Sequence, residues 1–156
     1  MTLPDTLLVN GTDLRDLLIV GDLSGLHAPG TRRGDNVRIP GRRGATYVEK
    51  VYDEYSFDIP VTVPPDNPDG TIPATPELRR ARYVANLRAV EEVIDTGALV
   101  LTRRFATSSG HEDMTCDGEY AGGRAMTLLN AETGKTILTF VNLDGCWIDG
   151  TGGLHL

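Results

Sequence analysis

The clearest alternation of apolar and polar residues along the chain lies at residues 55–63. Tyr55, Phe57, Ile59, Val61 and Val63 are apolar, and a polar residue or a proline stands between each pair of them. A period of two is typical of a strand that buries one face and exposes the other. The pattern therefore predicts a β-strand from Tyr55 to Val63.

A second strand is predicted directly before this one. Residues 45–52 are rich in Thr, Tyr and Val, which favour extended structure. The link between the two segments, Asp53-Glu54, is short and polar. This arrangement predicts a hairpin in which the two strands pair antiparallel.

A sharp turn is predicted ahead of that hairpin, at Pro40-Gly41-Arg42-Arg43-Gly44. Glycine adopts backbone conformations that other residues avoid, so the two glycines favour a bend on each side of the arginine pair. The bend presents two guanidinium groups to the surroundings. We expect this loop to contact another molecule.

Turn residues and loops are predicted on both sides of residues 40–63. A short apolar run, Leu7–Val9, ends at Asn10-Gly11, and a second run, Leu17–Val20, ends at Gly21-Asp22. Residues 23–38 hold three glycines and a proline without periodicity, which predicts a long loop. Residues 64–76 hold five prolines, and we interpret them as a linker on the surface.

One helix is predicted, over residues 76–96. Thr75 suits the N-cap, Pro76 suits the first helical position, and Gly97 suits the residue after the end. Apolar residues at spacings near three and four predict the face that packs on the rest of the protein. They are Leu78, Ala81, Ala85, Val90, Val93 and Ile94, with Val84 and Leu87 beside them. The charged face is expected to lie in solvent, or alternatively against another subunit.

Five more strands are predicted after the helix, at residues 98–105, 113–120, 125–130, 136–143 and 146–148. Turns are predicted between them at Gly122-Gly123, at residues 132–135 and at Asp144-Gly145. Many strands with a single long helix indicate an α+β fold: a mainly antiparallel β sandwich or split barrel, with the helix packed on it. We expect one domain over residues 1–156, with residues 64–76 as an internal linker.

Length and composition narrow the class of protein. With 156 residues, 40% of them hydrophobic, the chain is long enough to bury a core. No apolar run has the length that a membrane span needs. The N-terminal residues carry no basic cluster of the kind that opens a secretory signal. We therefore expect no membrane association, and a product that stays in the cytoplasm where it is made.

The charge is unevenly distributed around a formal net charge of −7. Arg32, Arg33, Arg38, Arg42 and Arg43 fall within twelve residues, whereas residues 112–156 hold seven acids against two basic residues. Complementary charged poles allow copies of one chain to stack or form rings, although two separate solvated surfaces would produce the same sequence pattern. The net negative charge argues against nucleic-acid binding over the whole surface.

Residues able to carry catalysis or bind a metal are sparse. His111, Asp113 and Cys116 lack the spacing of a known zinc motif, and His27 and His155 are placed in a loop and near the C-terminus. The two cysteines are too few for a disulfide scaffold, so we expect buried, reduced thiols. We predict no catalytic residues, no cofactor and no metal.

The order of elements resembles the N-terminal domain of siphophage distal tail proteins, within the wider tail-tube family. The resemblance rests on an N-terminal strand with residues 10–14, the PGRRG turn at residues 40–44, the segment at 55–59, the linker and the helix. It covers about the first 105 residues in ordered pieces.

This resemblance implies a structural protein of the virion that forms a hexameric ring at the tail tip. In such a ring the partners are copies of the chain, the tail tube protein and the baseplate hub protein, and DNA passes through the channel. The five arginines named above become candidates for the subunit interface. The alternatives are another tail-end protein such as a tube terminator, and a small β-rich hydrolase or carbohydrate-binding module.

Overall fold

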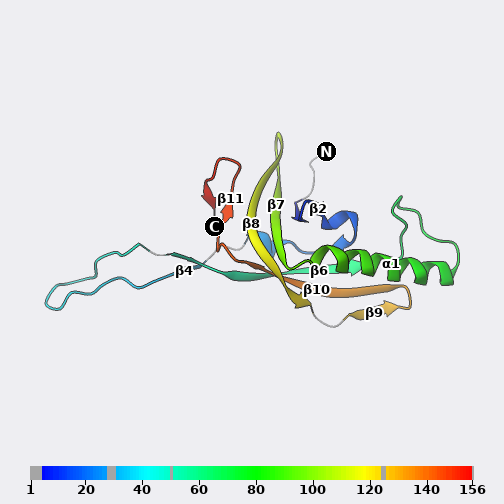
Figure 1. Ribbon diagram of the computed structural model, residues 1–156, viewed down its shortest axis with the longest axis horizontal. Coiled ribbons are helices and arrows are strands. Elements are labelled where there is room, and N and C mark those ends of the chain that lie inside the picture. Colours follow the sequence, from blue (N-terminus) through cyan, green and yellow to red (C-terminus); the bar gives the residue numbers. More distant parts are fainter. Residues whose placement is uncertain (1–4, 28–30, 50, 124–125, 156) are drawn as a thin grey trace.

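The computed structural model of the chain describes residues 5–27, 31–49, 51–123 and 126–155. It consists of a curled antiparallel sheet with one helix packed against it, so the predicted α+β fold class is confirmed (Figure 1). The strands are β1 Thr6–Val9, β2 Thr12–Asp13, β3 Ile19–Val20, β4 Thr31–Arg33, β5 Val51–Asp53, β6 Tyr55–Val63, β7 Ala98–Thr107, β8 Gly110–Gly123, β9 Thr127–Asn130, β10 Thr133–Asn142, β11 Trp147–Ile148 and β12 Leu154–His155. The helix is α1 Pro76–Ile94, and 3₁₀ turns cover Leu14–Asp16 and Ser24–His27.

Strands that are distant in sequence pair in the main sheet, whose order is β2-β1-β7-β8-β10-β6-β3. β9 extends the edge of β10 beyond the point where β8 leaves it, and the β11–β12 hairpin joins β8 through Ile148 and Thr115. β4 and β5 form a separate two-stranded ribbon. β6 pairs with β10. The strands that precede α1 in the sequence and the strands that follow it therefore belong to one sheet.

The strand predicted at residues 55–63 is confirmed as β6. Phe57 lies opposite Phe140 and Ile59 opposite Leu138 in β10, and these four side chains are buried. Trp147 packs beside Phe57, and its indole N–H donates a 2.8 Å hydrogen bond to the hydroxyl of Tyr55. The buried face of β6 therefore forms the centre of the core.

The predicted hairpin between residues 45–52 and β6 is wrong. Of the earlier segment only β5 is a strand, and it pairs with β4, with Tyr52 opposite Arg32. A two-residue hairpin loop needs positive φ angles, and neither Asp53 nor Glu54 has one. The chain therefore continues forward from β5 into β6 instead of turning back.

The turn predicted at Asn10-Gly11 is confirmed. Asn10 has φ 49° and Gly11 has φ 84°, which are the left-handed angles of a hairpin turn between β1 and β2. The amide of Asn10 also donates to the carbonyl of Val100 at 2.9 Å. This contact attaches the N-terminal hairpin to β7.

Helix α1 begins as predicted and ends two residues earlier than residue 96. The hydroxyl of Thr75 accepts a 3.3 Å hydrogen bond from the amide of Leu78, which is the expected N-cap. Asp95 caps the C-terminal end, and Gly97 follows with φ 82°.

The predicted buried face of the helix is only partly correct. Val90 and Ile94 are buried, but Leu78 is 57% exposed, and Ala81 and Ala85 are also exposed. Tyr83 and Asn86 lie on the buried side instead.

Hydrogen bonding explains why a polar residue lies on that side. The amide nitrogen of Asn86 donates to the carbonyls of Pro64 and Asp66 at 2.8 and 2.9 Å, which ties residues 64–66 to the helix. The guanidinium of Arg79 contacts Glu132 at 2.7 Å, one turn before Tyr83. These contacts set the rotation of α1 about its own axis. As a result, Leu78, Ala81 and Ala85 face solvent instead of the sheet.

Two of the turns predicted after the helix are misplaced. Gly122 and Gly123 belong to β8, where the register with β10 shifts between Thr139 and Phe140. The second turn falls at residues 131–132, so residues 133–135 already belong to β10. The turn at Asp144-Gly145 is confirmed, with φ 69° at Gly145. The strand predicted from residue 125 begins at Thr127, and residue 125 lies outside the described part.

Candidate assembly interface

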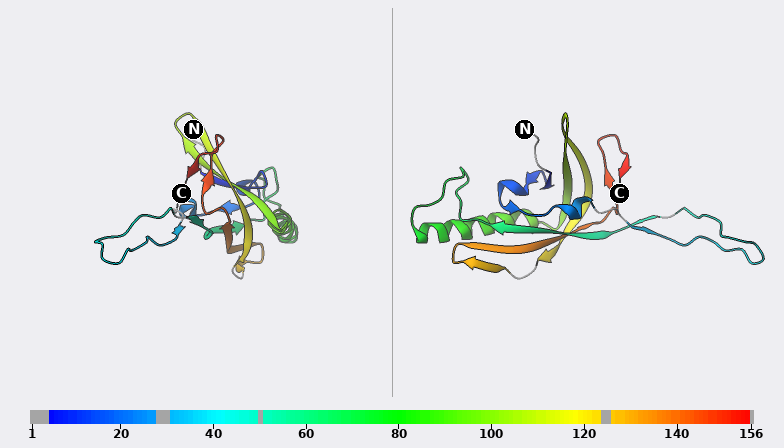
Figure 2. Two further views of the ribbon diagram at one scale, coloured as in Figure 1. Left: turned by 60° about the vertical axis from the view of Figure 1, so that its left-hand side comes forward. Right: turned by 180° about the vertical axis from the view of Figure 1, so that it is seen from behind.

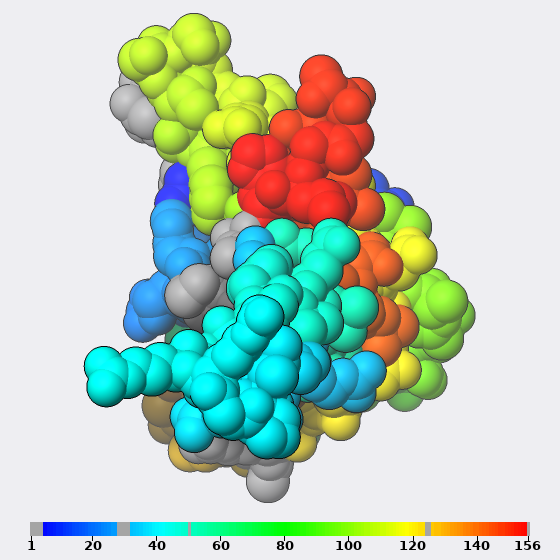
Figure 3. All heavy atoms as spheres, turned by 90° about the vertical axis from the view of Figure 1, so that its left-hand side faces the viewer, coloured from blue at the N-terminus to red at the C-terminus, as the bar shows by residue number. Residues whose placement is uncertain are grey.

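Residues 31–49 and 51–53 form an arm that projects from the body of the protein (Figure 1 and Figure 2). β4 and β5 pair at its base, and the backbones of Val37 and Thr46 form a single bridge farther out. Figure 3 looks along the arm from its tip, with the arm in cyan in front of the body. The long loop and part of the second strand expected from the sequence are thus the two sides of one extended ribbon.

The tip of the arm is the predicted PGRRG turn. The amide of Arg42 donates to the carbonyl of Ile39 at 3.1 Å, and Gly41 and Gly44 have φ angles of 80° and 83°. Residues without the freedom of glycine rarely adopt these angles, so the two glycines set the bend. Arg42 and Arg43 are exposed on it, as is Arg38 just before it.

The other two predicted interface arginines lie at the base of the arm. The guanidinium of Arg32 lies 5.2 Å from the ring centre of Tyr52 and donates to its hydroxyl at 3.2 Å, which raises the pKa of Arg32. Arg33 lies 3.8 Å from a carboxylate oxygen of Asp53. The structure therefore separates the five candidates into two that brace the ribbon and three that stand at its tip.

The arm also exposes apolar side chains. Val37, Ile39, Tyr47, Val48 and Val51 are between 41% and 63% exposed. A two-stranded ribbon is marginally stable in water by itself, and contiguous exposed apolar side chains often mark a surface that binds a partner. The arm has the chemistry of an interface: aliphatic and aromatic side chains interspersed with arginines.

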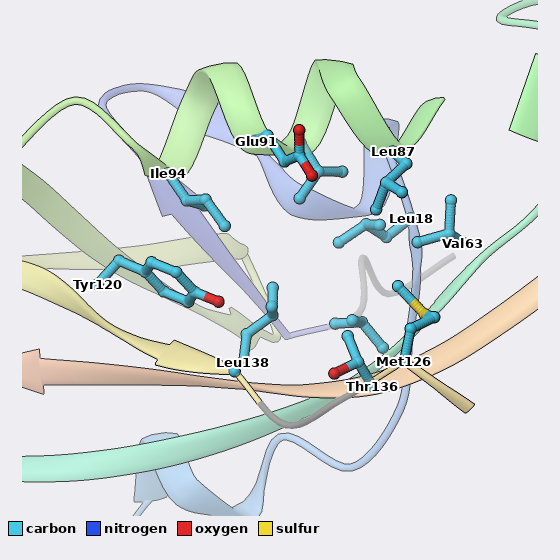
Figure 4. A pocket seen from close by; sticks show the side chains of 12 residues that line it. Leu18, Val63, Leu87, Glu91, Ile94, Tyr120, Met126, Thr136 and Leu138 are labelled. Atoms are coloured by element: carbon cyan, nitrogen blue, oxygen red, sulfur yellow. The ribbon is translucent and has the colours of Figure 1, made fainter. Parts of the chain in front are cut away.

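A cavity of about 190 Å³ lies between α1 and the sheet (Figure 4). Leu87, Val90 and Ile94 line it from the helix, and Tyr120 and Leu138 from the sheet. Glu91 is the only charged side chain among the described residues in its lining. Burial raises the pKa of Tyr120, and the charge of Glu91 raises it further.

The end of α1 above this cavity is acidic. Glu91, Glu92 and Asp95 lie in or next to the last turn, which contains no basic residue. Carboxylates at a helix C-terminus are unfavourable because the backbone carbonyls already give that end a partial negative charge. These carboxylates therefore do not stabilise the helix of the single chain, whereas they would attract a positively charged partner.

Part of the face of the sheet that turns away from the core is acidic. Asp58 lies opposite Thr139, whose hydroxyl donates to it at 2.7 Å, and Glu119 lies opposite Val141 on the same face. Asp117, two residues before Glu119, points to that face as well. All three acids are exposed.

The residues considered for metal binding are occupied by other contacts. Arg104 donates to both carboxylate oxygens of Asp113, at 2.8 and 2.9 Å, and this pairing lowers the pKa of Asp113. His111 lies 3.9 Å from the same carboxylate. Among the described residues, no group of three or more His, Cys, Asp or Glu side chains is placed to hold a metal ion. Cys116 and Cys146 are buried and unbonded, as expected.

Arg103 was not singled out from the sequence and is 4% exposed. Its guanidinium lies 4.9 and 5.0 Å from the ring centres of Phe105 and Trp147, and it donates to the carbonyl of Leu26 at 3.2 Å. Burial lowers the pKa of Arg103. The alternation of apolar and polar residues in β7 does not show that Arg103 is buried, because Trp147 and Leu26, which contact it, come from distant segments.

No described helix is both long enough and apolar enough to cross a membrane. No protein-family profile and no curated protein sequence matches the chain. Among solved structures, the chain is similar to the crystal structure of the SPP1 Dit (gp 19.1) protein, described as a paradigm of the hub adsorption apparatus in phages that infect Gram-positive bacteria. The TM-score is 0.58 at 14% sequence identity, over 94% of this chain. The match covers 53% of that protein, so the chain spans about half its length. This likeness shows a shared fold.

Proposed function

We propose that the chain is a structural component of a phage virion, a distal tail or tail-tube-like protein that forms a hexameric ring at the tail tip. The observation that carries this proposal is the fold, which matches a protein of a phage adsorption apparatus over nearly the whole of this chain. The family resemblance in the sequence supports the same role independently. In this role the ring joins the tail tube to the baseplate hub.

Ring formation is supported by surfaces that the single chain leaves open. The arm stands clear of the body, and β3 and β9 are short strands that pair on one side. Ile19, Leu128 and Leu129 on these strands are each more than half exposed. Closed rings cover such edges and apolar side chains because each subunit presents one surface to the next.

The outward face of the sheet supports a channel for DNA. Asp58, Asp117 and Glu119 would repel phosphates if this face lined the channel, so DNA would pass without being bound. The five arginines that are candidates for the subunit interface lie elsewhere, on the arm. We propose that the acidic face lines the channel and that the arm faces neighbouring subunits.

The role requires neither catalysis nor a cofactor. We propose that the protein is not an enzyme, works in the virion tail and is assembled in the host cytoplasm. Elemental analysis of the native protein checks this part, because stoichiometric metal would contradict it.

Electron microscopy of the purified protein tests the main proposal. Class averages should show sixfold rings with a central channel, and antibodies against the chain should label the tail tip of intact particles. Labelling at the head-proximal end would instead identify a tube terminator. A monodisperse monomer at every concentration, with no label on particles, would refute the tail assignment.

A further inference from the structure

The cavity under α1 is open to solvent and lined mainly by apolar side chains. Its volume of about 190 Å³ exceeds the roughly 150 Å³ of apolar cavities that admit a benzene ring. An inserted aliphatic side chain would contact Leu87, Ile94 and Leu138 and would itself lose contact with water. The carboxylate of Glu91 at its wall favours an occupant that brings a positive charge beside that side chain (Figure 4).

The tip of the arm presents this combination in a single turn. Ile39 is 42% exposed, and its carbonyl accepts the amide of Arg42, so an aliphatic side chain and a guanidinium leave the same bend. The turn is narrow because glycines stand at residues 41 and 44. A narrow turn enters a small cavity more easily than a strand within a sheet does.

The arm cannot reach the cavity of its own chain. Figure 1 and Figure 2 show the arm pointing away from the side of the body on which α1 lies. The occupant must therefore come from a second molecule. A second copy of this chain carries the required tip and is present at equal concentration.

A rival groove of about 490 Å³ lies on the other face of the sheet and is also apolar. Ile19, Pro60 and Ile137 line it, but its charged residue is Lys135. A lysine repels the arginines of the tip, whereas Glu91 attracts them. Charge therefore distinguishes the two sites.

We infer that the cavity under α1 receives the arm tip of a neighbouring copy, with Ile39 inserted and Arg42 paired with Glu91. This inference rests on the proposed function, since it requires that the chain assemble with itself. It assigns a receptor to the arm and explains the acidic end of the helix. The contact is head to tail, so repeated copies close into a ring or extend as a stack.

Charge reversal in the full-length protein tests the contact. Glu91→Lys and Arg42→Glu should each weaken subunit association by at least about tenfold in sedimentation velocity, and the double variant should recover most of that loss. Glu92→Lys is the matched control, because this neighbouring carboxylate does not line the cavity. It should assemble as the parent does.

Cysteine cross-linking provides a second measurement that does not depend on charge. Ile39→Cys combined with Leu87→Cys should give disulfide-linked oligomers on mild oxidation, while the native thiols stay buried. Linkage of Ile39→Cys to Ile137→Cys instead would place the tip in the rival groove and overturn the inference.

The two proposals fail in different ways. If the parent forms rings and Glu91→Lys forms them equally well, the receptor assignment is wrong and the ring stands. If the parent does not assemble and the Ile39→Cys, Leu87→Cys variant does not cross-link, both proposals are wrong.

Discussion

Replacing both arginines of the arm tip, Arg42→Ser with Arg43→Ser, separates assembly from stability. Both side chains are exposed, and neither forms an ion pair within the described residues. Exposed charges away from special features change the free energy of unfolding by less than about 0.5 kcal/mol each. The double variant should therefore melt within about 3 °C of the parent, with the same circular dichroism.

The effect on assembly should be much larger. A hydrogen bond to a charged group contributes about 1.5–3 kcal/mol, so losing two guanidinium contacts at each interface should cost about 3 kcal/mol or more. That corresponds to a roughly hundredfold weaker association, measurable by sedimentation velocity. Salt at about 1 M shortens the screening length to roughly 3 Å, so it should weaken association of the parent in the same direction.

A lysine pair at the same positions is the control for charge alone. Arg42→Lys with Arg43→Lys keeps both charges but loses the planar fork that binds a carboxylate through two hydrogen bonds. We expect an intermediate loss of association. If the double serine variant forms rings as the parent does, the arm tip has no role in assembly and the reasoning about the arginines is refuted.

Three further predictions concern the fold. Ile94→Ala should destabilise the protein by about 2–5 kcal/mol, because the side chain of Ile94 is buried. Leu78→Ala should cost under about 0.5 kcal/mol, because Leu78 is exposed. Equal shifts of the two variants in urea midpoint would show that the helix face is misassigned. Asn86→Ala should cost about 1–3 kcal/mol in the same assay, because it leaves two carbonyls without their donor, and an unchanged midpoint would contradict this role. The lowered pKa of Asp113 means that its pairing with Arg104 contributes stability above the unfolded pKa of about 3.9 and loses it as the pH falls through the folded pKa. The stability difference between the parent and Asp113→Asn should therefore shrink below about pH 4, and a difference that persists unchanged in acid would refute this assignment.

Part of the candidate interface was predictable because it depends on local chemistry. The bend at Gly41 and Gly44, and the exposure of Arg42 and Arg43, follow from residue types within a few positions of each other. The cavity beside Glu91 was not predictable, since it forms only where α1 meets strands from both sides of it in the sequence. Whether the five arginines form the subunit interface stays a prediction.

The sequence by itself determined the elements whose signals are short in range. The alternation in residues 55–63 specified β6 and its buried face, and Thr75, Pro76 and Gly97 specified the limits of α1 to within two residues. Helix caps, turns and strand periodicity depend on residues one to four positions apart, so they can be predicted from the sequence.

Tertiary structure alone decided which elements became partners. β6 pairs with β10 rather than with the segment before it, because pairing depends on register and twist across the whole sheet and not on nearness in the chain. Tyr83 and Asn86, not Leu78, face inward on α1, because contacts with residues 64–66 and with Glu132 select the rotation of the helix. An apolar side chain gains free energy from any surface that excludes water, so the hydrophobic pattern specifies that a face is buried without specifying which distant residues cover it.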